Sequence, residues 1–382
     1  MSENNMKRLG DYIRPVDVRN RDLKVERLLG ISVTKEFIPS IANTIGTDMS
    51  SYKIVYPNQF VYIADTSRRG DKIAIAYLKE NEEPALVSAI YTVLEVVDTN
   101  ALDPEYLMMW FRRPEFDRYA RFHSHGSARE VFDWEEMCEV QVPVPAIEKQ
   151  REIVAEYNTL ATRIETNKKL IATLEQTAQT FYRHTFIDNI DPNNLPSGWR
   201  MGTVGEFCAK MTSGGTPSRT NNDYWNSKDY PWLKTGEVQN NVIFETEEYI
   251  SEAGLKNSSA KLIPAGSVVM AMYGATAAQV GYLQCETTTN QACCNMICKS
   301  EVDAAFLYFH FLANQEEIKR LATGGAQENL SQDVISAQPI LIIEDDSVKQ
   351  PFSAIMQKFV CCFKEIKILT QMQTLLLSKM GA

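Results

Sequence analysis

The chain has 382 residues, 44% hydrophobic and 23% charged, which is an ordinary composition for a globular protein of two or three domains. A formal net charge of −10 taken alone argues against a nucleic-acid binder, and four histidines argue against a multi-histidine metal site. The N-terminal segment has no apolar core of a signal peptide and no 18-residue apolar run occurs, so we expect a cytoplasmic protein without a membrane partner.

Residues 1–145 are predicted to form a β-rich domain. An alternating run over Tyr52–Ala64 is interrupted by Pro57 and Asn58, a turn signal, and Val142–Pro145 ends the domain. The other predicted elements are the entry into a first strand at Leu9–Ile13, strands at Ile73–Ala76 and Ala89–Leu94, and a short buried helix at Tyr106–Phe111.

A long helix is predicted next, from about Ile147 to about Thr185 within a segment 146–188. At 1.5 Å per residue it would span roughly 55–60 Å. Apolar residues recur along it at alternating steps of three and four, which is typical of a coiled-coil seam, with one polar residue that can fix register. The seam consists of Ile153, Tyr157, Leu160, Ile164, Asn167, Ile171, Leu174, Ala178 and Phe181.

The second half follows the same order after a turn-rich linker at Asp191–Gly198. Its β-rich domain is predicted over 189–343, with strands at Ser267–Met272 and Ala292–Cys298 and a buried helix at Phe306–Phe311. Residues 344–382 are predicted to contain a second long helix, from about Asp346 to about Met380, whose seam consists of Ile355, Phe359, Cys362, Ile366, Leu369, Gln373, Leu376 and Met380.

The two halves are an internal repeat. The seams are offset by 195 residues, as are Leu9–Ile13 and Val204–Cys208, while the buried helices are offset by 200. Such drift indicates small loop insertions between the copies. The alternative for the helices is that they are ordinary amphipathic helices packed on a sheet, but the narrow stripe persists over four heptads in both.

The chain lacks the sequence motifs that amino methylation or ATP hydrolysis would need, although an enzyme with an unrecognised site is a further alternative. We find no [ND]-P-P-[YF] tetrapeptide for amino methylation, no glycine-rich loop for a methyl donor, and no GxxxxGK[ST] for ATP. Glu344–Lys349 resembles an acidic nuclease cluster, but at a helix start we favour a cap. Cys293, Cys294 and Cys298 lack a CxxC pair and a nearby histidine, so we expect packing thiols and no metal or cofactor.

The ordered motifs resemble one known family, the DNA-specificity (S) subunits of type I restriction-modification systems. A β-rich domain, the junction VPVPAIEKQREIV and a heptad helix are followed by LPSGWRMGTVGEF. The second copy contains SGGTPSRTNNDYW, YPWLKTGEV, IPAGSVVMAMYGATAAQVG, TNQACCNMI and GGAQENLSQDVISAQPI. The resemblance covers nearly the whole chain and is strongest from Leu195 to Ile343 and across the first helix; the first copy has no clear counterpart of SGGTPS or PWLKTG.

The resemblance implies an α+β fold with two target-recognition domains, each followed by a long helix, and the two helices packed as an antiparallel coiled coil. Each domain would read one half of a split target in double-stranded DNA. The helices would set the spacing and dock two methyltransferase (M) subunits, with restriction (R) subunits joining for cleavage. The chain itself would be non-catalytic. A protein-only coiled-coil adaptor is the alternative.

Candidate DNA contacts in the first copy are basic. Arg68, Arg69 and Lys72 lie at a predicted loop tip, for which a solvated hairpin is the alternative. The densest basic stretch lies in and after the short buried helix, and we favour a phosphate-binding face over a surface helix paired with Glu115 and Asp117. The stretch contains Arg112, Arg113, Arg118, Arg121, His125 and Arg129.

Candidate contacts in the second copy are hydroxyl, glycine and amide groups. One loop would let its backbone approach DNA or would form a tight structural turn; its candidates are Ser213, Gly214, Gly215, Thr216, Ser218 and Arg219. Tyr273, Thr276 and Gln279 take the place of the Arg68 loop, and Gln327 and Asn329 match the end of the basic stretch. Amides in one copy and arginines in the other suggest that the copies read different bases.

Overall fold

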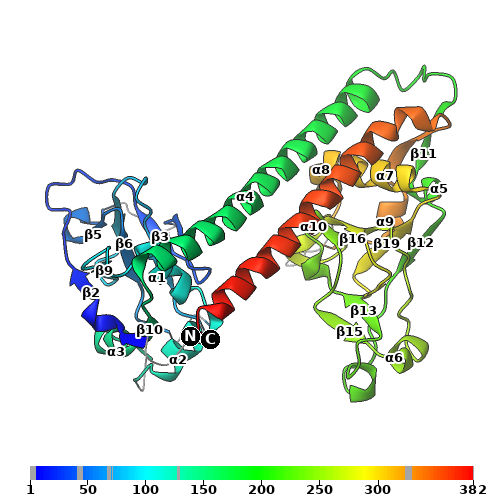
Figure 1. Ribbon diagram of the computed structural model, residues 1–382. Coiled ribbons are helices and arrows are strands. Elements are labelled where there is room, and N and C mark those ends of the chain that lie inside the picture. Colours follow the sequence, from blue (N-terminus) through cyan, green and yellow to red (C-terminus); the bar gives the residue numbers. More distant parts are fainter. Residues whose placement is uncertain are drawn as a thin grey trace. The chain divides into compact units, whose positions relative to one another are not determined.

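The computed structural model describes residues 6–40, 46–66, 70, 72–126, 130–322 and 329–381. The chain divides into two compact units (Figure 1). The first unit comprises Met1–Arg163 and Leu369–Ala382, and the second comprises Ile164–Ile368. Each long helix therefore contributes one end to each unit.

The first unit is built on a four-stranded antiparallel sheet with the order β2-β9-β6-β7. All of β6 is buried, because Phe60 and Tyr62 face one hydrophobic cluster and Val61 faces another across the sheet. The strands are β2 (Ile13–Val16), β6 (Gln59–Tyr62), β7 (Ile75–Tyr77) and β9 (Thr92–Val96), with the pairs β1 (Met6–Arg8) and β10 (Gln141–Pro143), β3 (Leu29–Ile31) and β4 (Phe37–Pro39), and β5 (Lys53–Val55) and β8 (Ala85–Val87).

Helix α1 (Pro104–Phe111) is the buried helix of this unit. The Asp103 side chain caps it by accepting from the Tyr106 N–H, and Pro104 supplies the first helical position. The remaining helices are η2 (Leu9–Asp11), η3 (Met49–Ser51), α2 (Pro114–Phe122) and α3 (Trp134–Glu139).

The second unit contains a five-stranded sheet with the order β12-β19-β16-β17-β14, in which only β14 and β17 run parallel. Its strands are β12 (Lys210–Ser213), β14 (Asn241–Ile243), β16 (Val268–Ala271), β17 (Val280–Leu283) and β19 (Cys293–Ile297). A second sheet has the order β15-β13-β18, from Glu248–Ile250, Tyr230–Leu233 and Thr288–Thr289, and β11 (Trp199–Thr203) pairs with β20 (Pro339–Ile343).

Helix α7 (Glu301–Ala313) is the buried helix of the second unit, and every residue from Asp303 to Ala313 is buried. The shorter helices are α5 (Val204–Phe207), α6 (Glu252–Lys256), α8 (Gln315–Arg320) and α9 (Gln332–Ser336), with 3-10 turns η5 (Asn222–Tyr224), η6 (Thr235–Glu237), η7 (Gly274–Thr276) and η8 (Asp346–Val348).

The units repeat one plan, as the sequence predicted. The order β2-β9-β6-β7 recurs as β12-β19-β16-β17. The Phe132 N–H donates to the Ala64 carbonyl at 2.9 Å, and the Leu330 N–H donates to the Met272 carbonyl at 2.8 Å, at equivalent places. One detail of the prediction was wrong: the two segments expected to enter a strand are the helical turns η2 and α5, and strands β2 and β12 begin after them.

The two long helices are confirmed. They are α4 (Ile147–Arg183), which continues into the π-helix η4 (His184–Asp188), and α10 (Gln350–Lys379). Every predicted seam side chain is buried or half-buried. In the first unit Ile153 and Tyr157 share a hydrophobic cluster with Met380, and in the second unit the rings of Phe181 and Phe352 lie 5.3 Å apart. Among the described helices, none is long and apolar enough to cross a membrane.

Candidate nucleic-acid interface

Most predicted contacts of the second copy lie at one end of its five-stranded sheet. Strands β12 and β16 end there, and β14, β17 and β19 begin there, as the pairs Ser213–Cys294 and Ala271–Cys293 establish. We call this the second loop end. It consists of residues 213–219, 234–240, 273–279, 290–291 and 329.

The glycines of the 213–219 loop serve the protein's own packing. A Cβ atom on Gly214 would lie 2.2 Å from the backbone oxygens of Thr289 and Asn290, and one on Gly215 would lie 2.3 Å from Ser259 Oγ. The Gly215 N–H donates to the Thr289 carbonyl at 2.8 Å. These contacts support the tight structural turn, the second of the two interpretations that the sequence left open.

Hydroxyl groups anchor the same loop. Ser213 Oγ donates to Gln332 Oε1 at 2.8 Å, and Thr216 Oγ1 donates to Gln291 Oε1. Ser218 Oγ lies 2.9 Å from Thr220 Oγ1 at the exposed tip. The anchored residues therefore form the base of the loop, and Ser218 and Arg219 form its exposed part.

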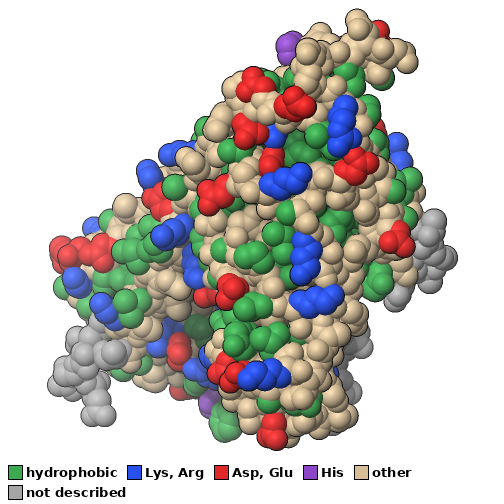
Figure 2. Space-filling model, turned by 90° about the vertical axis from the view of Figure 1, so that its right-hand side faces the viewer, with side chains coloured by type: hydrophobic (Ala, Val, Ile, Leu, Met, Phe, Trp, Pro, Cys, Tyr) green, Lys and Arg blue, Asp and Glu red, His purple; other side chains and the backbone are tan. Residues whose placement is uncertain are grey.

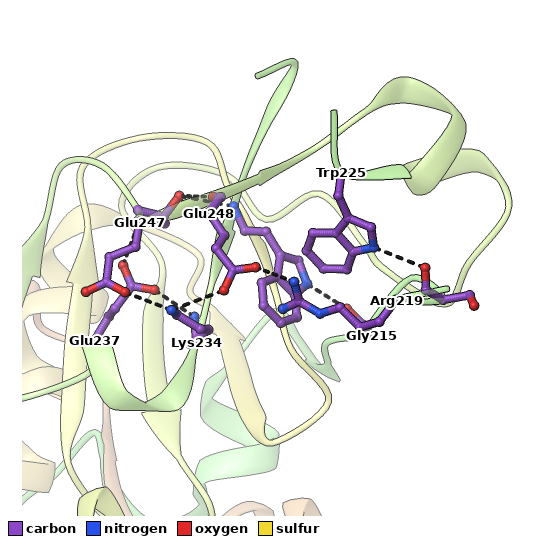
Figure 3. Close-up of polar contacts among 10 residues, drawn as sticks. Gly215, Arg219, Trp225, Lys234, Glu237, Glu247 and Glu248 are labelled. Atoms are coloured by element: carbon purple, nitrogen blue, oxygen red, sulfur yellow. Dashed lines mark hydrogen bonds and ion pairs between the residues drawn. The ribbon is translucent and has the colours of Figure 1, made fainter. Parts of the chain in front are cut away.

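Arg219 stacks on an aromatic ring and pairs with an acidic side chain (Figure 3). Its guanidinium carbon lies 3.6 Å from the Trp225 ring centroid, and its Nη1 donates to Glu248 Oε2 at 2.5 Å. Lys234 Nζ lies 3.2 Å from Glu248 Oε1 and 2.7 Å from Glu247 Oε2. The Arg219 hydrogen bond, followed by the one from Lys234, lowers the pKa of Glu248, which keeps the carboxylate charged and offsets both cations.

The 273–279 loop joins two other segments of the second loop end. Tyr273 is exposed and forms an antiparallel bridge with Asn329, and Thr276 Oγ1 donates to the Thr235 carbonyl at 3.1 Å. The loop 234–240, which contains Thr235, was not among the predicted contacts, although its PWLKTG motif had contributed to the resemblance. Only the long-range pairing of the strands places it here.

The first unit has an equivalent loop end. Asp65 bridges Val131 as Tyr273 bridges Asn329, and the loop that contains Lys72 precedes β7 as the 273–279 loop precedes β17. Thr66 Oγ1 donates to Ser124 Oγ at 2.8 Å, and His125 bridges Val131. The candidates Arg68, Arg69 and Arg129, like Gln327 in the second copy, lie outside the described residues.

The basic stretch of the first copy does not form one continuous face. Arg113 is buried, with its guanidinium 4.1 Å from the Trp110 ring centroid and its Nε 3.5 Å from Glu115. Arg112 lies 5.6 Å from the Tyr157 centroid on α4. Arg113 therefore contributes to packing, and its burial removes it from the surface on which we had expected phosphate contacts.

Carboxylates lie beside most of the remaining basic side chains of this stretch. Arg118 pairs with Glu115 at 3.1 Å, Arg121 pairs with Glu130, and His125 Nε2 lies 3.4 Å from Glu136. The face shown in Figure 2 likewise has Lys and Arg side chains interspersed with Asp and Glu. Neither observation indicates a large unbalanced basic surface.

The two other clusters of the sequence are structural. Cys293 and Cys294 lie in β19, where burial raises the pKa of each thiol to about 12, so both remain protonated packing groups at neutral pH. In the Glu344–Lys349 segment, Asp345 Oδ1 accepts from the Ser347 N–H at 2.8 Å, which is the expected cap. Lys349 is buried against Asp303.

Comparison with known proteins identifies the family. Residues 11–176 and 196–374 match the family described as Type I restriction modification DNA specificity domain. The chain is similar to the specificity subunit of the type I restriction enzyme MjaIX from Methanocaldococcus jannaschii, with 23% identity over 192 residues, 47% of this chain and 44% of that protein. It is also similar to the HindI specificity subunit from Haemophilus influenzae, with 22% identity over 372 residues, 77% of this chain and 80% of that protein.

One solved structure has the same fold. The type I restriction-modification S subunit from M. genitalium matches with a TM-score of 0.59 and 14% identity, over 100% of this chain and 97% of that one. The match to the first curated relative spans less than half of that protein. The two family matches together cover most of the chain. The chain therefore belongs to the family of DNA specificity (S) subunits of type I restriction-modification systems.

Proposed function

We propose that the chain selects the DNA target of a type I restriction-modification complex, with each loop end reading one half of a bipartite target. The observation that carries this proposal is the recurrence of one sheet and one loop end in both units, with different side chains at equivalent positions. Bases are distinguished by the donors and acceptors of their edges, so such differences suit two unlike half-sites.

Gly236 in the second loop end supports a surface that meets an external backbone. A Cβ atom there would meet no described atom within 4 Å, and Gly236 is not among the residues with a positive φ. Neither packing nor backbone conformation therefore requires glycine at this position. A DNA backbone could approach closely in the space that a side chain at this position would fill. The exposed neighbours Ser218, Arg219, Tyr273 and Asn329 complete the proposed surface.

The first loop end would read the other half-site, with Lys72, Arg121 and His125 contacting the DNA. An ion pair holds Arg121 beside Glu130, and His125 Nε2 lies 3.4 Å from Glu136, so binding of phosphates would have to compete with these carboxylates. Such competition weakens the affinity of the isolated chain. We infer that partner subunits supply part of the DNA affinity, in accord with the net charge of −10.

We further propose that α4 and α10 form an antiparallel coiled coil that sets the spacing and docks two methyltransferase subunits. Restriction subunits would join the complex for cleavage, and the chain itself would be non-catalytic. The seam side chains of both helices, each buried or half-buried, support this assignment.

Mapping of methylated bases across a genome with and without this chain tests the proposal. We expect one bipartite motif to be methylated only when the chain is present. An unchanged methylation pattern would contradict DNA selection, and a continuous motif would contradict one half-site per unit.

A further inference from the structure

A pair of amide side chains joins two loops of the second loop end. Gln315, the first residue of α8, donates from Nε2 to the Ala278 carbonyl at 2.8 Å and to Asn240 Oδ1 at 2.9 Å. Its Oε1 accepts from Asn240 Nδ2 at 3.0 Å, and Asn240 Oδ1 also accepts from the Val280 N–H at 3.0 Å. The Gln315 side chain is therefore hydrogen-bonded to both loops, to Asn240 in 234–240 and to Ala278 in 273–279.

An ion pair takes the corresponding place in the first unit. Asp117 lies in the first turn of α2, and its Oδ1 accepts from Lys35 Nζ at 2.6 Å and from the Ile73 N–H at 3.2 Å. Both charged side chains are buried. Asp117 thus holds the end of the loop before β7 against the turn between β3 and β4, which contains Lys35.

The two arrangements hold equivalent residues, although Asp117 accepts from a backbone N–H and Gln315 donates to a backbone carbonyl. The Ile63 N–H donates to the Ala74 carbonyl and the Ala271 N–H donates to the Gln279 carbonyl, each at 2.9 Å, in matching strand pairs. Ile73 and Ala278, the residues just before, therefore occupy the same place. In both units a polar side chain from the helix after the buried helix holds this place, although aspartate acts in one and glutamine in the other.

The held residues adopt backbone conformations that need support. Asn240 and Ala278 have φ values of 53° and 67°, and Lys35 has a φ of 66°, all in the left-handed region that side chains disfavour. A loop containing such a residue relaxes unless surrounding contacts fix it. The side-chain hydrogen bonds of Gln315 and Asp117 supply contacts of this kind directly at or beside these residues.

We propose that Gln315 with Asn240, and Asp117 with Lys35, are two positioning clamps that fix the residues they contact at the loop end of their own unit and so determine base selectivity in one half-site each. This inference rests on the proposed function. In this proposal neither clamp contacts DNA. Each acts by positioning the loop residues to which it is hydrogen-bonded. Both units have a clamp at this place, whereas their loop residues differ. This is expected if the repeated fold keeps the contacts that position the loops and varies the residues that contact bases.

The test uses the complete complex with its methyltransferase partner and a library of DNA targets randomised in both half-sites. Gln315→Glu keeps the side-chain volume but removes the donor and places an oxygen against two acceptors. Asp117→Asn removes the charge that pairs with buried Lys35. We expect each variant to lower base discrimination on the order of tenfold, because small displacements of positioned groups have effects at least this large. Only the half-site of the affected unit should change.

Matched controls make the same substitutions elsewhere. Gln338→Glu alters a half-buried glutamine of the second unit that donates to the Val334 carbonyl, and Asp98→Asn alters an aspartate beyond the other end of β9. Both controls should keep the wild-type selectivity. Asp117→Asn combined with Lys35→Gln forms an amide pair without a lone buried charge, and we expect it to restore discrimination even if Asp117→Asn alone disturbs folding.

Unchanged selectivity in both half-sites or equal relaxation of both would overturn the clamp proposal. Loss of methylation with disassembly would also overturn it if it occurs in Gln315→Glu, or in Asp117→Asn combined with Lys35→Gln. Hydrogen exchange separates that failure from failure of the proposed function, because it needs no DNA. Gln315→Glu should raise amide exchange in 235–241 and 273–280 while β11 and β20 keep theirs; unchanged exchange would refute the clamp. A wild-type complex that methylates no bipartite motif would instead refute the proposed function.

Discussion

At the scale of single residues, buried His310 makes stability depend on pH. Its side chain lies in the core of the second unit, and Tyr182 Oη is 2.6 Å from its Nδ1. Burial lowers the pKa of His310 from its ordinary value of 6.5 to about 3, because the interior disfavours the charged ring. The neutral ring is therefore the form compatible with the folded state.

Stability should fall as the pH drops below about 6.5, because the unfolded chain then binds a proton that the folded chain does not. The loss is about 1.4 kcal/mol per pH unit, or roughly 2 kcal/mol between pH 6.5 and pH 5. We expect His310→Gln to remove this part of the pH dependence in urea denaturation. His184→Gln changes an exposed histidine and should leave it. If the free energy of unfolding depends on pH in the same way in wild type and His310→Gln, buried His310 is not the source of this dependence.

Substitution of Glu248 tests whether Arg219, with which it pairs, contacts DNA. Glu248→Gln removes the negative charge beside Arg219 and Lys234, and its one amide oxygen can still accept a hydrogen bond from one of them. If this surface meets phosphates, the freed cation strengthens binding by the complex and increases the magnitude of the slope of log affinity against log salt by about one.

Glu206→Gln is the matched control for this change. It frees Arg200, 2.7 Å away, and α5 lies before the opposite end of β12. The salt dependence should then match that of wild type. An equal increase in both variants would show a general effect of charge rather than a contact at the second loop end.

At the scale of elements, local patterns predicted the two long helices, the two buried helices and some of the strands. The seam repeats placed both long helices within a few residues, because helical periodicity is a local property of the sequence. Pairing across long separations was beyond such patterns. Lys35 and Asp117 are 82 residues apart, and nothing local marks either as a partner. The burial of Arg113 and the approach of loop 234–240 to 273–279 depend on similar long-range packing.

Asn167 tests the balance between stability and specificity in α4. Its side chain is buried at a seam position, and its Nδ2 has no hydrogen-bond partner among the described residues. A buried polar group without a partner costs about 1–3 kcal/mol. We expect Asn167→Leu to stabilise the chain by an amount of this order in thermal or urea denaturation.

Asn158→Leu on the same helix provides the comparison. Asn158 is exposed and donates to Glu105 Oε2 at 2.5 Å, so leucine there loses a hydrogen bond and buries little. Stabilisation by Asn158→Leu as large as that by Asn167→Leu would point to helix propensity rather than burial. A gain in stability with loss of assembly would indicate that Asn167 fixes the helix register.

At the scale of the whole molecule, the two repeated units share their sheet and helices and differ in their loops. The sheet order, the buried helix and the clamped place before the fourth strand recur in both units. The loops between these elements differ in length and side chains, which accounts for the drift in offset from 195 residues. A repeated support with unlike loops is suited to reading two unlike sequences by one mechanism.

Lengthening both helices tests the proposed spacer. Seven residues inserted into α4 and seven into α10 keep each seam in phase, because the heptad is its period. The added rise is about 10 Å at 1.5 Å per residue, which corresponds to roughly three base pairs of duplex DNA at 3.4 Å each. Methylation mapping should then show unchanged half-sites with a longer unread spacer. An insertion in α4 alone mismatches the two helices and should abolish methylation. An unchanged spacer after the paired insertion would mean that the helices do not set the distance between the half-sites.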